Sequence, residues 1–298
     1  MENIIKLEKI SQFNTLKGIE TKHPLISVYD NSNAKALPNH CRLHFGFYAI
    51  FLKAANCGEL KYGRSSYDYD EGTLVFFGPG QVVEISHEEN YQPSGLVLLF
   101  HPDLIKGTSL GKQMSQYSFF SYESNEALHL SLAEQEIIKD LFVKLEYEIS
   151  QTIDKHSKTI ITNGIELLLN YSVRFYDRQF ITRENINNGV LAKFENLLAD
   201  YFNSNKIHEL GFPLVGYFAN QLNLSPNYFG DLIKKETGKT AQELIHLKLI
   251  DLAKEKIFDT EKSISQIAFD LGFKYPQHFN RMFKKSTGYT PNEYRMLN

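Results

Sequence analysis

Two segments near the C-terminus of this 298-residue chain repeat one another at a spacing of 50 residues. The first, residues 226–244, reads PNYFGDLIKKETGKTAQEL, and the second, residues 276–294, reads PQHFNRMFKKSTGYTPNEY. Eight of the 19 aligned positions are identical, which indicates a duplicated structural unit rather than chance similarity. Any fold of this chain must therefore contain the same small unit twice.

Each copy has the pattern of two helices joined by a short turn. In the first copy, helices are expected at residues 214–222 and 226–236, and in the second copy at residues 264–271 and 276–285. The second helix of each copy begins with proline, which suits the first helical turn, and is followed by glycine, which suits a left-handed end. The pattern predicts two helix-turn-helix units, whose second helices can enter a DNA major groove.

The segment between the copies, residues 241–258, reads as one continuous helix. About 18 residues at 1.5 Å each give a rod of about 27 Å. Successive major grooves on one face of a duplex are about 34 Å apart. The spacer therefore suits two reading helices that meet consecutive grooves of one DNA molecule.

Residues 196–298 resemble the DNA-binding domain of AraC/XylS-type bacterial transcription regulators. The second unit carries most of the similarity, in Ile267-Ala268, Leu271-Gly272-Phe273, Phe279, Arg281, Phe283-Lys284-Lys285, Gly288, Thr290-Pro291 and Tyr294-Arg295. The resemblance implies a sequence-specific transcription regulator, with activation and contact to RNA polymerase among its expected properties. It implies no enzyme activity and no cofactor.

The second unit is expected to read most of the DNA sequence. Exposed side chains near the start of a recognition helix meet base edges, and here they belong to Pro276, Gln277, Asn280 and Arg281. Gln and Asn pair with adenine, and Arg pairs with guanine. Two lysines at the far end of this helix, Lys284 and Lys285, are expected to hold phosphates.

The first unit is a weaker reader by composition. Alignment places Asn227, Gly230 and Asp231 at its base-reading positions. Glycine offers no side chain, and aspartate repels phosphate, although a carboxylate can accept from cytosine N4. We therefore expect mainly backbone contacts from this unit, made by Asn227, Tyr228, Lys234 and Lys235.

The charge distribution gives mild support for DNA binding. The whole chain has a net charge of −3, yet residues 210–298 carry 12 Lys and Arg against 9 Asp and Glu. Local clustering of basic residues matters more for DNA binding than the total charge.

Residues 1 to about 125 show short apolar runs separated by turn signals. Strands are expected at residues 45–52, 73–77, 82–85 and 95–100, and short strands at this spacing are typical of a barrel or sandwich. The run EGTLVFFGPGQVVEIS followed by GLVLLFHPDL resembles the cupin-like sensor domain of many AraC-type regulators. This resemblance implies a β-barrel that binds a small-molecule effector.

The next segment changes to a helical period, with amphipathic helices expected at residues 132–149 and 160–175. Two interpretations stay open: the helices cover the open face of the barrel, or they form a homodimer interface, as the resemblance implies. The Asn-rich segment 182–189 is the expected linker. The predicted division is a β domain at 1–125, a helical dimerisation and linker region at 126–187, and the DNA-binding domain at 188–298.

A candidate ligand face lies on an early strand. His40, Arg42 and His44 alternate with apolar residues, so on a strand they share one face. With Tyr48 and Arg64 they are candidates for contact with a carboxylate, sugar or phosphate. The alternative is an ordinary solvent-facing surface.

Several other classes of protein fit poorly. The two cysteines form no disulfide framework or zinc spacing, and no secretory signal or membrane-spanning run is visible, so a cytoplasmic protein without a membrane segment is expected. The closely spaced His-x-His of a metal-binding cupin is absent, so neither a metal site nor a catalytic site is predicted.

The sequence thus predicts a two-domain α+β protein: a cupin-like β-barrel followed by helices, then an all-α domain with two helix-turn-helix units joined by a long helix. The predicted function is a DNA-binding regulator that responds to a small molecule. Two alternatives are a metal-dependent cupin enzyme fused to a DNA-binding module and a non-specific architectural DNA-binding protein.

Overall fold

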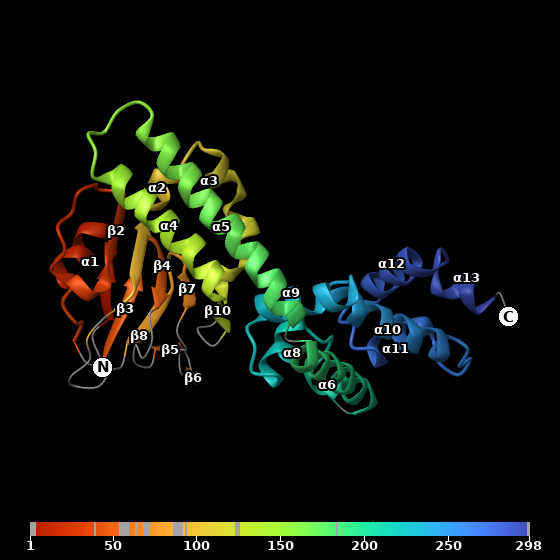
Figure 1. The fold of residues 1–298 in the computed structure, drawn as a ribbon. Coiled ribbons are helices and arrows are strands. Elements are labelled where there is room, and N and C mark those ends of the chain that lie inside the picture. The colour runs from red at the N-terminus through yellow and green to blue at the C-terminus, as the bar shows by residue number, and fades with distance from the viewer. Residues whose placement is uncertain are drawn as a thin grey trace. The chain divides into compact units, whose positions relative to one another are not determined.

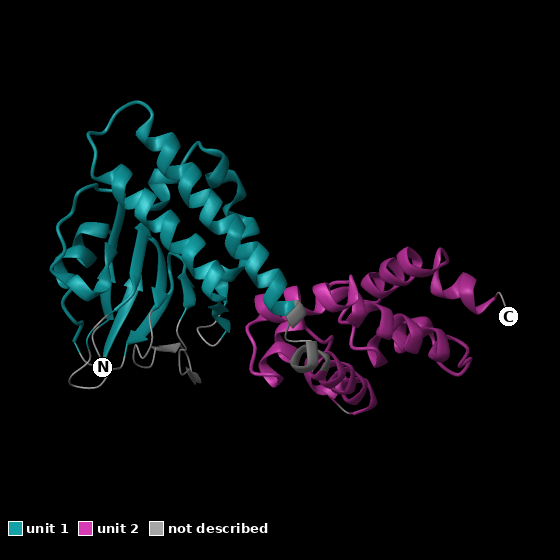
Figure 2. Ribbon diagram, viewed as in Figure 1, with its two compact units in different colours: residues 1–182 teal, residues 183–298 magenta. Residues whose placement is uncertain are grey.

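The computed structural model describes residues 4–38, 40–53, 60–62, 65–67, 72–85, 92, 94–122, 126–182, 184–204 and 206–296. The chain divides into two compact units, residues 1–182 and 183–298 (Figure 2).

The first unit contains two five-stranded sheets (Figure 1). The first sheet has the order β1 (Ile4–Leu7), β3 (Cys41–Phe45), β8 (Val82–Ile85), β5 (Leu60–Tyr62) and β6 (Ser65–Tyr67). The second sheet has the order β10 (Leu128–His129), β7 (Thr73–Phe77), β4 (Tyr48–Lys53), β9 (Leu96–Phe100) and β2 (Ile26–Asp30). The β1–β3 pair is parallel, and the other described pairs are antiparallel.

The first unit does not form the predicted closed β-barrel, so that prediction is wrong. Within the described residues, no strand of one sheet pairs with a strand of the other, so the two sheets stay separate. The single strand predicted at residues 45–52 is in fact the end of β3 and most of β4, which lie in different sheets. Gly46 and Phe47 separate the two strands, and the uninterrupted apolar run at this point concealed the change of sheet.

One apolar core joins inward-facing residues of both sheets. Helix α1 (Ile10–Lys17) adds Phe13 to it, and the rings of Phe13, Phe45 and Phe47 meet edge to face with centroids 5.5–6.4 Å apart. Aromatic pairs prefer such edge-to-face geometry over a face-to-face sandwich. Helix α1 ends at Gly18, whose φ of 68° gives the left-handed turn that a glycine adopts without strain.

Two long helices pack on the second sheet. Helix α4 (Leu132–Ile149) contacts β2 and β9, and α5 (Ser157–Thr182) pairs with α4 and contacts β10 (Figure 1). Between β9 and β10 the chain forms the short helices α2 (Pro102–Ile105) and α3 (Ser109–Gln113). The Arg178 guanidinium donates to Glu134 at 2.8 and 3.0 Å and to the His129 carbonyl at 2.6 Å, which ties α5 to the start of α4. The helices therefore do cover a sheet face, as one of the two interpretations expected.

The second unit is entirely helical in its described residues. Its helices are α6 (Glu184–Asn203), α7 (Lys206–Leu210), α8 (Val215–Gln221), α9 (Pro226–Thr237), α10 (Ala241–Ile257), α11 (Ile264–Asp270), α12 (Pro276–Thr287) and α13 (Pro291–Arg295). The five helices of the duplicated region and its spacer begin and end within two residues of their predicted positions.

The predicted linker at residues 182–189 contains the boundary between the two units and is helical from Glu184 onward. Helix α5 ends at Thr182 and α6 already begins at Glu184, although the boundary between the two units falls in this stretch. Asn and Gly have low helix propensity, but propensity is a weak preference that packing of a longer amphipathic helix overrides. The ring of Phe194, in the same helix, packs edge to face on Phe218 and Phe229.

No helix in the described part of the chain is both long enough and apolar enough to cross a membrane.

Candidate nucleic-acid interface

The two repeats match in their hydrogen bonds as well as in their sequence. The Thr237 hydroxyl donates to the carbonyls of Ile233 (2.7 Å) and Lys239 (3.1 Å). In the second repeat, the hydroxyl of Thr287 makes the equivalent bonds at 2.8 and 3.0 Å. These threonines fasten the C-terminus of each candidate reading helix, which fixes its end relative to the helix that follows.

The helix after each reading helix begins with the same cap. The side chain of Glu243 accepts from the Thr240 backbone N–H at 2.7 Å, and that of Glu293 accepts from Thr290 at 2.7 Å. These backbone N–H groups are the main reason why the pKa of each carboxyl lies below its usual value. Such a capping box satisfies two donors that the helix itself cannot use.

The two reading helices start differently. Helix α9 is capped by the Ser225 hydroxyl, which accepts from the Tyr228 N–H at 3.2 Å. Helix α12 follows Tyr275, whose side chain makes no capping bond. Both helices open with proline and end at a left-handed glycine, Gly238 (φ 71°) or Gly288 (φ 83°).

The polar stripe of α12 faces solvent. Phe279 and Phe283 are both 0 % exposed and belong to the core of the second unit. This burial directs five other side chains outward, and Gln277, Asn280, Arg281, Lys284 and Lys285 are all exposed. The exposure predicted for Gln277, Asn280 and Arg281 is confirmed, while Pro276 is half-buried at the first turn.

The stripe of α9 is less polar and partly covered. Asn227, Lys234 and Lys235 are exposed, whereas Gly230 and Asp231 are half-buried. A Cβ built on Gly230 would meet no atom within 4 Å, so this position opens on empty space. The first reading helix therefore offers few side chains for base contact in the middle of its exposed face.

Tyr228 differs from the other predicted DNA-contacting residues because its side chain is buried, with 6 % exposed. Sequence alignment placed it beside Asn227 on the exposed start of α9. Its ring instead lies on the packed side of the helix, beside Phe229 and Leu232, which are also buried.

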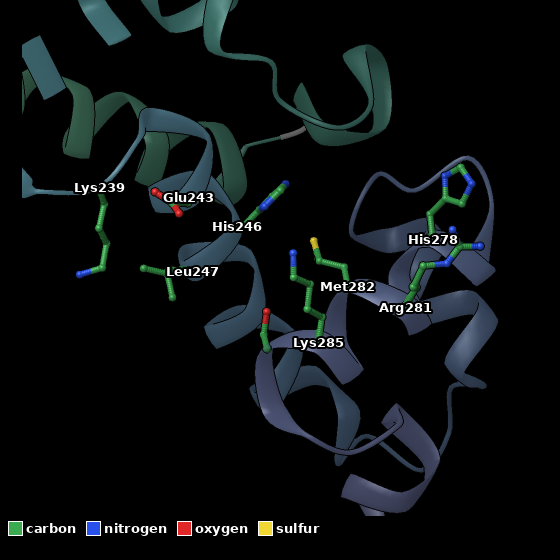
Figure 3. Close-up of a pocket in the computed structure, with 9 residues that line it drawn as sticks. Lys239, Glu243, His246, Leu247, His278, Arg281, Met282 and Lys285 are labelled. Carbon is green, nitrogen blue, oxygen red and sulfur yellow. The ribbon is translucent and has the colours of Figure 1, made fainter. Parts of the chain in front are cut away.

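An open groove between α10 and α12 was missed by sequence reasoning (Figure 3). Its volume is about 590 Å³, and it is lined by Lys239, Glu243, His246, Leu247, His278, Arg281, Met282, Lys285 and Ser286. The residues of α10 recur at helical spacing, but nothing in the sequence indicates that this face meets α12, about 40 positions further along.

Burial and a neighbouring cation change the pKa of His246, a histidine that lines the groove. Burial, and secondarily the Lys285 ammonium, lower the pKa of His246, while Glu243 opposes the shift. The Gln242 amide lies 3.0 Å from Nε2 of His246. The ring is therefore held in place, and its neutral form is favoured more than that of an exposed histidine.

Arg295 braces the end of the spacer helix. Its guanidinium donates to the carbonyls of Ile257 (2.6 Å), Lys262 (3.0 Å) and Asp259 (3.2 Å). These carbonyls lie at the C-terminus of α10 and in the turn to α11, where a helix leaves acceptors without internal partners. This contact fixes the second helix-turn-helix unit against the spacer.

The candidate ligand residues of the first unit are only partly brought together. Arg42 and His44 lie on the face of β3 away from the core, while Cys41, Leu43 and Phe45 are buried on the opposite face. This alternation is confirmed. Nε of Arg42 and Nδ1 of His44 are buried and have no hydrogen-bond partner in the part of the chain that the structure describes.

The other three candidates lie elsewhere. His40 precedes β3, is exposed and has a positive φ of 57°. Tyr48 belongs to the second sheet, where it stacks on Phe100 (4.8 Å between centroids) and meets Phe120 edge to face. Arg64 lies outside the described residues. The four described candidates, His40, Arg42, His44 and Tyr48, are therefore not assembled into one pocket. Among the described residues, no group of three or more His, Cys, Asp and Glu is placed to hold a metal ion.

Comparison with known proteins places the C-terminal region in a defined family. A helix-turn-helix domain family matches residues 218–296. The transcriptional regulatory protein YesN of Bacillus subtilis is 36% identical over 111 residues, which are 36% of this chain but 28% of YesN. The chain thus spans well under two thirds of that relative.

A second relative aligns over most of both chains. The transcriptional activator RhaS of Escherichia coli is 23% identical over 261 residues, 87% of each protein. Among solved structures, an AraC-type DNA-binding regulator from Chromobacterium violaceum is 22% identical and covers 37% of this chain and 91% of its own, with a TM-score of 0.31. The duplicated units and these sequence matches place residues 218–296 in a helix-turn-helix domain family, and the chain is similar over most of its length to a transcription regulator of the AraC/XylS type.

Proposed function

We propose that this protein recognises a specific DNA sequence mainly through α12. The observation that carries the proposal is the exposed row of Gln277, Asn280 and Arg281 above the fully buried Phe279 and Phe283. The amide side chains have the donor and acceptor pair that matches adenine, and the guanidinium matches guanine. Lys284 and Lys285, one turn further along, supply phosphate contacts that set the register.

Helix α9 positions the protein on the neighbouring major groove. Its exposed side chains, Asn227, Lys234 and Lys235, suit contacts with the DNA backbone. At Gly230 there is open space and no side chain, so the bases opposite this position are not contacted. The half-buried Asp231 is the one side chain in the middle of this face that suits a cytosine. Specificity is therefore expected to be concentrated in the half-site under α12.

The first unit is proposed to bind a small-molecule effector and to change DNA affinity by favouring one arrangement of the protein. Support comes from its β-rich fold, which precedes the DNA-binding domain, and from the alignment with RhaS over both units. Arg42 and His44 are the retained candidates for an anionic or hydroxylated ligand, because their buried nitrogens have no partner among the described residues.

Dimerisation through α4 and α5 is part of this proposal. Val143 and Tyr147 on α4, and Leu167 on α5, leave 62 %, 65 % and 47 % of their surface exposed. Large apolar side chains exposed at helical spacing suit association with a second copy. We further propose a cytoplasmic activator that contacts RNA polymerase, since RhaS is an activator.

Selection of bound duplexes from a random DNA pool tests the proposal. The wild-type chain is compared with a variant that carries Gln277→Ala, Asn280→Ala and Arg281→Ala. We expect one enriched motif about two helical turns long, or a repeat of it for a dimer, and loss of one half of the motif in the variant. Equal enrichment by both proteins would contradict reading by α12, and equal binding of all sequences with a steep salt dependence would indicate a non-specific binder.

A further inference from the structure

The groove between α10 and α12 exists because the two helices pack at one end only. Leu249 and Ala253, in the C-terminal half of α10, share a core with Phe279 and Phe283 of α12. Side chains in the N-terminal half of α10 are separated from those of α12 by an open space of about 590 Å³ (Figure 3).

The rim of the groove is cationic. Lys239, Arg281 and Lys285 contribute three positive charges from both sides. Glu243 is the one carboxylate in the lining, and both the N–H and the hydroxyl of Thr240 donate to it, at 2.7 and 2.9 Å. Because these bonds aim the carboxylate at the helix start, the groove keeps an excess of positive charge.

The groove also carries apolar side chains. Leu247 is 45 % exposed, and Met282 is half-buried on the side of α12 that faces α10 (Figure 3). A surface with apolar side chains between cations suits a ligand that alternates anionic and apolar groups. The sugar-phosphate backbone of DNA alternates in this way.

The position of the groove relates it to both reading helices. His278, Arg281, Met282 and Lys285 share one face of α12, since residues three and four apart are neighbours on a helix. Arg281 also belongs to the adjacent reading stripe, with Gln277. Lys239 directly follows Gly238, which ends α9. The groove therefore borders the reading face of α12 and lies one residue beyond the end of α9.

We infer that this groove seats the DNA backbone that separates the two major-groove segments. Lys239 and Lys285 contact its phosphates, and Leu247 and Met282 contact its deoxyribose rings. The inference rests on the proposed binding of DNA by both reading helices. It assigns DNA contacts to Lys239, His246, Leu247 and Met282, which lie outside the base-reading set.

The first test compares two lysine variants of the full chain. Lys239→Gln removes a groove cation, whereas Lys248→Gln removes an exposed cation of α10 that does not line the groove. Both substitutions change the net charge equally. We expect Lys239→Gln to weaken binding to the selected duplex about three- to tenfold and to reduce the slope of log K against log[salt] by about 0.9, with unchanged sequence preference. Lys248→Gln should leave both quantities near wild type.

The second test locates the contact on the DNA. A neutral methylphosphonate replaces single phosphates between the two half-sites. Wild-type binding should fall at one or two adjacent positions, and Lys239→Gln should show no further loss there. Equal DNA affinity and equal salt dependence of Lys239→Gln and Lys248→Gln would overturn the inference. So would an equal loss of binding by wild type and Lys239→Gln at every methylphosphonate position. If wild type shows no specific binding at all, the proposed function fails first, and that result is distinct from specific binding without a groove contact.

Discussion

The same substitution, glycine to alanine, is expected to have opposite effects at two positions of the second unit. Gly230 lies inside α9, and a Cβ there meets nothing within 4 Å. Alanine lowers the backbone entropy lost on folding, so Gly230→Ala should stabilise the unit by about 0.5–1 kcal/mol. Because the position offers no base contact, the DNA sequence preference should not change.

Gly272 lies in the turn between α11 and α12, with φ of 81°. A Cβ there would lie 2.9 Å from Cγ1 of Ile207, 3.0 Å from the Gly211 carbonyl carbon and 3.1 Å from the Phe212 nitrogen. The left-handed backbone costs about 1–2 kcal/mol for alanine, and overpacking adds about 1–3 kcal/mol. We therefore expect Gly272→Ala to destabilise the unit by about 2–5 kcal/mol.

Calorimetry of the full chain measures both effects, since the protein lacks tryptophan for a fluorescence assay. For a unit of roughly 100 residues, 1 kcal/mol moves the Tm by about 4 °C. The transition of the helical unit should thus rise by about 2–4 °C for Gly230→Ala and fall by about 8–20 °C for Gly272→Ala. A shift of the same sign for both variants would refute the reasoning from backbone conformation and local space.

Three further predictions concern single side chains. Arg295→Ala should lower the unfolding free energy by about 2 kcal/mol, because three carbonyls lose a charged donor. Arg295→Lys should lower the unfolding free energy less. Chemical denaturation followed by circular dichroism measures both variants. Burial lowers the pKa of Lys17 to about 8. Between pH 8 and the ordinary lysine pKa, the folded state therefore binds fewer protons than the unfolded state, and the free energy of unfolding should rise with pH across this window. The substitution Lys17→Met should flatten this rise. DNA binding should strengthen as the pH falls from 8 to 6, because a DNA phosphate in the groove favours the protonated form of His246. Affinities measured by fluorescence anisotropy should depend less on pH for His246→Gln than for wild type.

The duplicated helices were predictable because local signals mark their ends. Pro226 and Pro276 open the reading helices and Gly238 and Gly288 close them, and each residue type has a backbone preference that acts without tertiary context. The apolar spacing of α12 likewise predicted which side chains face solvent. Burial of Phe279 and Phe283 follows from that spacing alone.

Features that depend on tertiary packing were not predictable in this way. Gly46 and Phe47 divide a continuous apolar run between two sheets, and only the packing of those sheets shows where the strand ends. Tyr228 is buried although its aligned partner, His278, is exposed, so the two copies pack differently around equivalent positions. The groove depends on how α10 and α12 diverge, which no local pattern records.

The most direct test of the account couples one side chain to one base pair. The affinity of wild type and of Arg281→Ala is measured for the selected duplex and for a duplex in which the guanine under α12 is replaced, and the four values form a double-mutant cycle. We expect a coupling energy of about 1–3 kcal/mol, so that the base replacement weakens wild-type binding but leaves that of Arg281→Ala nearly unchanged. Equal losses in both proteins at every guanine of the half-site would contradict base reading by α12.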